Sequence, residues 1–147
     1  MRKLLFTLLI LNIGGCSLLN VSKREISFAE QKWQSAGIQN YNYELIIASL
    51  EHYQECSTPR AGIEIEVRGG KLKKFGTCEL NAKYAKEFGT IDAVFLTLRN
   101  EKSESPPGLE VRFNENYGFP EYIDINYSRW LTDHSVQYHI LKFVEVK

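Results

Sequence analysis

Residues 63–72 read IEIEVRGGKL, and this stretch decides the fold. Apolar side chains alternate with charged ones over residues 63–68, which is typical of a strand with one buried and one solvent-facing side. The two glycines at 69–70 can both adopt the positive φ angles of a tight hairpin turn. Residues 71–77 then form the returning strand, and because two adjacent lysines interrupt its alternation, we predict that it lies at an exposed edge.

The segment before this hairpin combines a helix and a strand. Residues 41–50 are rich in aromatic and β-branched side chains, which favours a strand. Further upstream, Ser27 and Glu30 match the capping box that begins many helices, and Gly37 can end the helix that follows. The apolar face predicted for this helix consists of Ala29, Trp33 and Ala36.

The C-terminal half repeats this order of elements, although not its residues. Residues 80–88 contain a predicted helical turn, and Thr90 is a good N-cap for a second helix. The apolar stripe of that helix consists of Ile91, Val94, Phe95 and Leu98. Residues 109–113 and 123–127 alternate apolar and polar side chains, which predicts two half-buried strands. Residues 134–144 are partly apolar on both faces, so we expect a central, covered strand there.

Together these elements predict an α+β protein. We expect an antiparallel sheet of about six strands with two helices packed on one face, an order compatible with tandem αβββ halves sharing one sheet. The chain has 147 residues, of which 44% are hydrophobic, which suits a single domain with a real core. Its 18 basic and 18 acidic residues balance, which argues against nucleic-acid binding because that normally requires a basic face.

The N-terminus, MRKLLFTLLILNIGGC, has the organisation of an export signal. Two basic residues precede an apolar run that is too short to span a bilayer, and small or polar residues follow it. The ending Ile13-Gly14-Gly15-Cys16 resembles the lipobox of bacterial lipoproteins. This resemblance implies that residues 1–15 are a signal peptide that is removed, and that the Cys16 thiol carries a diacylglyceryl group. The alternatives are a plain secretion signal with an incidental cysteine and an uncleaved anchor.

The same resemblance implies a location in the bacterial cell envelope. Two or three acyl chains anchor a protein stably to a membrane. Ser17, directly after the lipidated cysteine, favours the outer membrane, facing the periplasm. We therefore predict a lipidated cysteine and tether over residues 16–26 and a single domain over residues 27–147. After residue 16, no apolar run reaches the length of a transmembrane helix.

Export would place the domain in an oxidising compartment, where disulfides persist. If Cys16 is acylated, Cys56 and Cys78 remain to pair with each other. Strands separated by a third strand lie about 10 Å apart, whereas a disulfide needs Cα atoms within about 7 Å. The pairing therefore requires loops that bend toward each other, or a different strand order. The alternatives are two free thiols or a metal site, although only His52 lies nearby in the sequence as a further ligand.

The chain contains Trp33, Gly37-Ile38 and Tyr41-x-Tyr43 near its start, and Tyr117-Gly118-Phe119-Pro120 further on. These and several other motifs resemble one family of small bacterial lipoproteins whose domain has no established function. The resemblance covers residues 29–143 and is most specific at its tryptophan-to-tyrosine opening and at one aromatic turn. It therefore implies the fold and an envelope location, but no activity. The motifs that carry it are Trp33, Gly37-Ile38, Tyr41-x-Tyr43, Val67-Arg68-Gly69-Gly70-Lys71-Leu72, Thr90-Ile91-Asp92, Val111-x-Phe113, Tyr117-Gly118-Phe119-Pro120 and Ile123-x-Ile125.

Signatures of known catalytic chemistry are missing from the sequence, which has no nucleophile elbow, zinc-protease motif or phosphate-binding loop. The odd separation of His134 and His139 places them on opposite faces of a regular strand, which does not favour a shared metal. Glu64 and Glu66 share a face with Arg68, which indicates a charged sheet surface more than a catalytic carboxylate pair. We therefore predict no metal and no cofactor.

The turn that contains Tyr117, Phe119 and Pro120 is the candidate binding surface, because aromatic side chains in loops often anchor partners. The alternative is that its aromatics fold back over the sheet edge. The sequence favours a non-catalytic binding module held at the membrane by lipid, with an envelope protein as a further partner. Two other functions stay open: a periplasmic, hydrolase-like enzyme with His134 or His139 in a pocket, and a carrier with an apolar cavity between helices and sheet.

Overall fold

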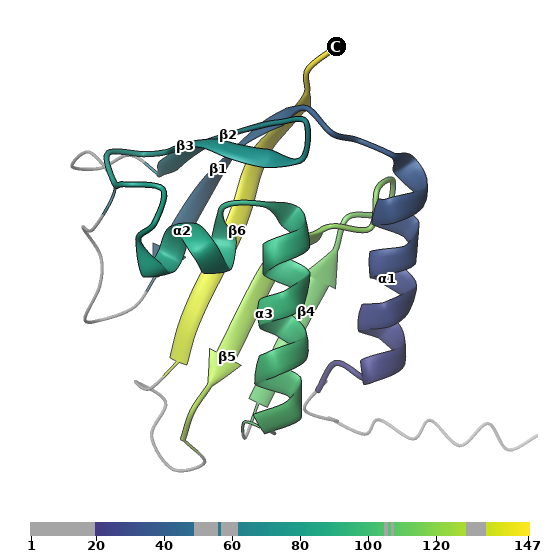
Figure 1. The fold of residues 1–147 in the computed structure, drawn as a ribbon. Helices are drawn as coiled ribbons and strands as arrows, with labels where there is room; N and C mark the ends of the chain where they lie inside the picture. The colour runs from purple at the N-terminus through teal and green to yellow at the C-terminus, as the bar shows by residue number, and fades with distance from the viewer. Residues whose placement is uncertain (1–19, 49–55, 57–61, 105, 107, 129–134) are drawn as a thin grey trace, which may run out of the picture.

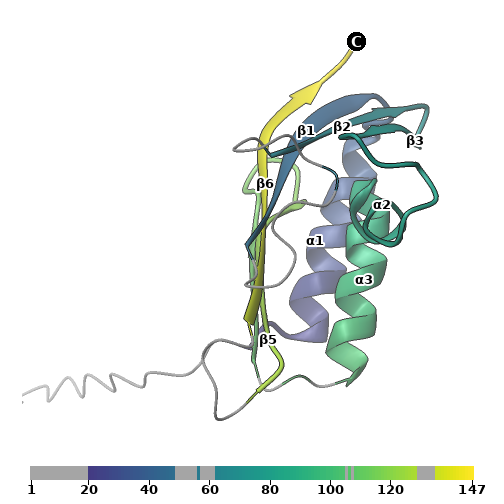
Figure 2. The same cartoon turned by 90° about the vertical axis from the view of Figure 1, so that its left-hand side faces the viewer.

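The computed structural model describes residues 20–48, 56, 62–104, 106, 108–128 and 135–147. Its six strands form one antiparallel sheet in the order β3-β2-β1-β6-β5-β4. All three helices lie on one face of this sheet, as Figures 1 and 2 show. Along the chain the elements are α1 (Lys23–Ala36), β1 (Tyr41–Ala48), β2 (Ile63–Arg68), β3 (Lys71–Phe75), α2 (Lys83–Phe88), α3 (Ile91–Glu104), β4 (Gly108–Phe113), β5 (Pro120–Asn126) and β6 (Ser135–Glu145).

This architecture confirms the predicted α+β class and the single antiparallel sheet. Each half of the chain contributes helix and then three strands, and the halves join where β1 pairs with β6 at the centre of the sheet. The predicted helical turn is α2, a third helix. β6 is central, as expected, but it is covered on one face only: Tyr138 and Ile140 are buried, whereas Val144 is 57% exposed. No described helix or strand lies on the opposite face, which we call the open face of the sheet.

The predicted start of the first helix is wrong. Its N-cap is Ser22, whose hydroxyl accepts a hydrogen bond from the Glu25 N–H at 3.1 Å, while the Glu25 carboxylate accepts from the Ser22 N–H at 2.7 Å. Val21 and Ile26 occupy the positions of a hydrophobic staple and are both buried. Ile26 lies on the buried face of α1 with Ala29 and Trp33, whereas Ala36, which was predicted on that face, is exposed. Residues 23–26, predicted to be tether, therefore belong to α1.

An aromatic cluster around Trp33 joins α1 to the sheet. The Trp33 ring meets three other rings edge to face: Tyr41 at 5.3 Å, Phe143 at 5.9 Å and Phe119 at 6.3 Å between centroids. Phe143 in turn stacks on Tyr41 at 5.4 Å and on Phe119 at 4.5 Å. Such pairs add to the energy of burial. This cluster therefore connects both halves of the chain.

Two tyrosines of β1 hold the corner between α2 and α3. Because they are two residues apart on one strand, Tyr41 and Tyr43 point to the same face. The Tyr41 hydroxyl accepts a hydrogen bond from the Ile91 N–H at 3.0 Å, and the Tyr43 hydroxyl donates to the Phe88 carbonyl. Helix ends leave such backbone groups without intrahelical partners. Burial raises the pKa of both tyrosines.

The structures of α3 and of the β2–β3 hairpin match the predictions from the sequence. The Thr90 hydroxyl accepts from the Ala93 N–H at 3.1 Å, and the predicted apolar stripe of α3 is fully buried. Gly69 and Gly70 have φ angles of 57° and 69°, which confirms the tight turn. β3 is an edge strand with three lysines and an irregular register against β2, as its broken alternation predicted.

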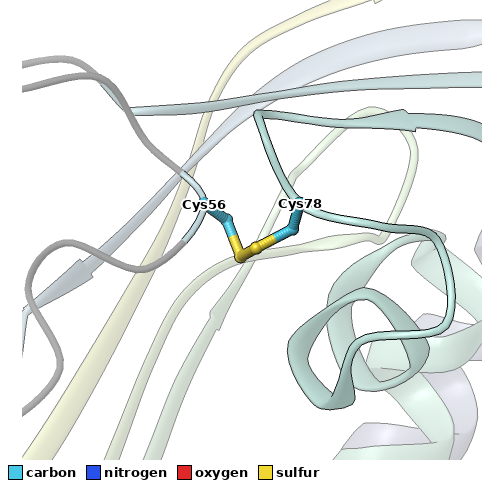
Figure 3. The surroundings of a disulfide bond; sticks show 2 residues. All are labelled: Cys56 and Cys78. Atoms are coloured by element: carbon cyan, nitrogen blue, oxygen red, sulfur yellow. A yellow bond between two sulfur atoms is a disulfide. The ribbon is translucent and has the colours of Figure 1, made fainter.

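Cys56 and Cys78 lie at disulfide distance (Figure 3). Their Cα atoms are 4.7 Å apart. The strands that precede them, β1 and β3, are not neighbours, so the two cysteines meet outside the strands. The Thr77 N–H donates to the Cys56 carbonyl at 3.0 Å, and the Gly76 N–H donates to the Glu64 carbonyl at 2.8 Å. Main-chain hydrogen bonds thus hold Gly76 and Thr77, which lead from β3 to Cys78, against β2 and Cys56.

Removing this disulfide should lower the free energy of unfolding by about 3 kcal/mol, because the bond closes a loop with a separation of 22 residues in the unfolded chain. The measurement is urea denaturation of the Cys56→Ser/Cys78→Ser double variant, followed by circular dichroism. Wild-type protein under a reducing agent is the control and should match the variant. Equal midpoints for the oxidised wild type and the variant would contradict a stabilising role.

Candidate functional site

The aromatic turn does not present the binding surface that the sequence suggested. Phe119 is 2% exposed and Pro120 is buried, while Tyr117 is half-buried with its ring 5.8 Å from that of Phe143. Phe119 belongs to the aromatic cluster around Trp33. The two aromatics therefore fold back onto the protein, which is the alternative stated for this turn, and they cannot serve together as exposed anchors.

The turn is fixed in place by its own hydrogen bonds and by α1. The Asn114 side-chain oxygen accepts from the N–H groups of Asn116 at 3.0 Å and Tyr117 at 2.8 Å. Gly118 has a φ angle of 84°, and a Cβ atom there would lie 2.5 Å from the Ala29 carbonyl oxygen. Only glycine allows this close approach between turn and helix. The turn therefore closes one end of the space between α1 and β4.

That space is a groove of about 560 Å³, which we call the α1–β4 groove. Figure 1 shows α1 standing to the side of β4, the last strand of the sheet. Phe28 on α1 is 71% exposed, the highest value among the large hydrophobic side chains of the described residues. The residues that line the groove include Asn20, Val21, Phe28, Ala29, Lys32, Val111 and Phe113.

Charged residues also line this groove. They are Glu25 and Lys32 of α1, Glu115, and Glu110 and Arg112 of β4. Hydrogen bonds from Ser22 hold the pKa of Glu25 below its ordinary value. The groove thus combines an apolar strip with both signs of charge, a composition that suits binding of a peptide better than binding of a purely apolar or purely anionic ligand.

A second hollow of about 470 Å³ opens where β6 parts from β5. Pairing between β5 and β6 ends at Tyr122 and His139. Beyond His139, β6 stays paired with β1 on its other side. The Arg112 guanidinium lies 4.4 Å from the centre of the Tyr122 ring, and the His139 ring lies 5.0 Å from it. Tyr122 is thus enclosed between a cation and an imidazole on the open face.

The hydroxyl and carboxylate groups near this hollow do not form a catalytic pair with His139. The Tyr122 hydroxyl donates to Asp124 at 3.1 Å, and Gln137 donates to the same carboxylate oxygen at 3.1 Å. Burial raises the pKa of Tyr122, and its hydrogen bond to Asp124 raises it further. Among the described residues, no hydrogen bond joins His139 to an acid or a hydroxyl, and no cluster of His, Cys, Asp and Glu could hold a metal. His52 and His134 lie outside the described residues.

Further charged pairs on the open face match the charged sheet surface predicted there. Lys74 lies 2.7 Å from Glu64, and Lys142 lies 2.6 Å from Glu44. The Lys142 ammonium is the main cause that holds the pKa of Glu44 below its usual value. Glu64 is paired with Lys74, and Glu66 lies 3.8 Å from Arg68. Glu64 and Glu66 are therefore not an isolated pair of carboxylates.

The carrier hypothesis required an apolar cavity between helices and sheet. Where α2 faces β6, the rings of Phe88 and Tyr138 stack at 4.2 Å. The two hollows flank the β4–β5 hairpin instead. Sequence reasoning missed the α1–β4 groove because it depends on two distant segments; its one local signal was Phe28, an aromatic residue off the apolar face of its helix.

Two further findings concern membrane-spanning helices and similarity to known proteins. Within the described residues, no helix has the length and apolarity needed to cross a membrane. The model of a family of unknown function, DUF6174, matches residues 25–145, which run from α1 to β6. This confirms the resemblance to a family without known function, while the lipoprotein character of the chain stays a prediction. No curated protein matches the chain significantly, and neither does any solved structure.

Proposed function

Because the chain belongs to this family of unknown function, we propose its role from its own residues: it is a lipid-anchored envelope protein whose domain is a non-catalytic binding module. The observation that carries the anchor is the N-terminal sequence MRKLLFTLLILNIGGC, with its lipobox-like ending at Cys16. The described residues contain no catalytic pair at His139, and they contain a groove with apolar and charged lining. These observations support binding more than catalysis.

If Cys16 is the anchor, the start of α1 limits how far the domain can lie from the membrane. Residues 17–22 precede Lys23, and such a segment spans at most about 20 Å when extended. The α1–β4 groove begins at Asn20 and Val21, within the last residues of this segment. A short tether confines the domain near the membrane, which raises its effective concentration toward partners held there.

The anchor is tested by the Cys16→Ala change in a chain whose residues 1–15 are replaced by an ordinary cleavable secretion signal. We expect this variant in the soluble periplasmic fraction, whereas the wild type stays with membranes until detergent is added and takes up labelled palmitate. Cys56→Ser is the matched control, since it removes another cysteine and should keep the label. Equal membrane association of wild type and Cys16→Ala would refute the lipid anchor.

The binding role is tested separately in cells with a photo-crosslinking amino acid. Placed at Phe28, in the α1–β4 groove, it should give a discrete and reproducible adduct. Placed at Lys71, on the opposite edge strand, it serves as the control and should not give that adduct. The same adducts from both positions, or none from Phe28, would count against a binding role for the groove.

A further inference from the structure

We propose that an extended segment of a partner protein binds in the α1–β4 groove and pairs with the free edge of β4 as an added strand. This inference rests on the proposed binding role and names the kind of partner that the groove accepts. Its basis is the direction of the backbone groups of β4, the contrast between the two edges of the sheet, and the charges beside the groove.

The backbone of β4 directs unpaired groups into the groove. The Leu109 carbonyl accepts from the Val21 N–H at 2.9 Å, and the Leu109 N–H donates to the Asn20 side chain at 3.0 Å. Both groups of Leu109 thus point away from β5. Because this direction alternates along an antiparallel strand, the N–H and C=O of Val111 also point outward. Among the described residues, no hydrogen bond reaches these two groups of Val111.

The next residues agree with this alternation. The Asn114 N–H donates to the Phe119 carbonyl at 2.8 Å, so Asn114 points toward the β5 side. Phe113, one residue earlier, therefore points outward like Val111. Another extended backbone can form hydrogen bonds with an N–H and a C=O that point outward at every second residue.

The two edges of the sheet differ in their protection. β3 carries Lys71, Lys73 and Lys74 and an irregular register, both of which discourage pairing with another chain. β4 has no such lysines, and its regular register with β5 extends from Gly108 to Arg112. Within the part of the chain that the structure describes, hydrogen bonds from Asn20 and Val21 cover only its beginning. The chain thus blocks one edge and leaves part of the other open beside an exposed phenylalanine.

The residues of β4 also specify the sequence of the added strand. On the helix side, alternate side chains of the added strand would contact Phe28, Val111 and Phe113, which favours apolar residues there. On the open face, one side chain of the added strand would lie opposite Arg112. The side chain two residues further along the added strand would lie opposite Glu110. In antiparallel orientation the complementary order is apolar, acidic, apolar, basic, because opposite charges across strands stabilise pairing.

A second copy of this chain fits the edge less well. The β4 sequence Leu-Glu-Val-Arg-Phe, residues 109–113, would be complementary to itself in antiparallel pairing. However, Asn20 and Val21 occupy the position beside Leu109 that the Phe113 of the other copy would need. The C-terminal residues 144–147 read VEVK, but β6 already pairs with β1 as far as Glu145. A narrow peptide avoids both obstacles.

The probe is the peptide acetyl-TIEIK-amide, titrated into isotope-labelled full-length protein in detergent micelles. Nuclear magnetic resonance should show the largest shifts at the Val111 and Phe113 amides, with slowed hydrogen exchange at Val111. The peptide acetyl-TIKIE-amide has the same composition with its charges reversed and should bind about fivefold more weakly or worse. Shifts centred on β3 or on the open-face hollow, or no binding of either peptide, would overturn the proposal.

Two variants separate strand addition from other modes of binding. Val111→Pro removes the outward N–H at an edge position that tolerates proline, and should weaken binding at least about fivefold with the fold intact. The double variant Glu110→Arg/Arg112→Glu should invert the preference between the two peptides, and it provides the test if the proline variant fails to fold. Unchanged binding by folded Val111→Pro, or unchanged preference in the charge-swapped protein, would overturn strand addition.

The remaining outcomes distinguish this inference from the proposed function. A concentration-dependent dimer that Val111→Pro abolishes would assign the edge to a second copy and overturn the peptide. A crosslink from Phe28 in cells together with no effect of Val111→Pro would retain a binding module but refute strand addition. Peptide binding with a failed palmitate test would refute the anchor alone.

Discussion

Replacement of Trp33 by alanine is expected to lower the free energy of unfolding by about 3–5 kcal/mol, the range for removing a large aromatic side chain from a core. Trp33 is 3% exposed and meets three aromatic rings edge to face. Those rings come from β1, the β4–β5 turn and β6, so the cavity would open between both halves of the chain. Far-UV circular dichroism during urea denaturation measures the loss.

Gln34→Ala is the matched control for this change, because Gln34 is the next residue of α1 and is exposed. It should shift the free energy of unfolding by no more than about 0.5 kcal/mol. If Trp33→Ala and Gln34→Ala had similar effects, the aromatic cluster would not be the centre of the core.

Replacement of Gly76 by alanine should be as severe, with a loss of about 3 kcal/mol or more, because it combines backbone strain with a clash. Gly76 has a φ angle of 52°, and a Cβ atom there would lie 1.8 Å from the Cys56 carbonyl oxygen. The backbone would have to move, and with it the Thr77 N–H that donates to that same oxygen. Counting free thiols and measuring urea denaturation together would show whether the Cys56–Cys78 pair still forms.

Gly69→Ala separates the two causes. Gly69 has nearly the same φ angle, 57°, but a Cβ atom there would meet nothing within 4 Å. It should therefore cost only the strain of the left-handed conformation, about 1 kcal/mol. Equal losses in Gly69→Ala and Gly76→Ala would mean that the close approach to Cys56 contributes nothing.

The elements that the sequence predicted best are those whose local pattern and tertiary role agree. Alternation over residues 63–68 and the glycine pair after it needed no distant information, and the same holds for the stripe of α3. The prediction for the start of α1 failed because the chain has two Ser-x-x-Glu motifs, at Ser22 and at Ser27. Both match the local pattern of a capping box. The burial of Ile26 decides between them, and that depends on the sheet.

The candidate site was less predictable than the fold. The turn at residues 114–119 was expected, but the inward direction of Phe119 depends on Trp33 and Phe143, which lie far away in the sequence. The α1–β4 groove likewise requires the strand order, which places β4 at an edge beside α1. Residues 1–16, with the predicted signal peptide and Cys16, lie outside the described residues, so the lipid anchor stays a prediction.

The tyrosines of β1 imply a pattern of joint change among relatives of this chain. Tyr41 and Tyr43 place their hydroxyls at a helix corner that lies 50 and 45 residues further along the chain. A relative that lost this corner would retain two buried hydroxyls without partners, a condition that selection removes by substituting phenylalanine. Tyr-x-Tyr in the strand and a helix corner downstream should therefore be inherited together, so that this three-residue motif predicts a distant structural element as well as its own strand.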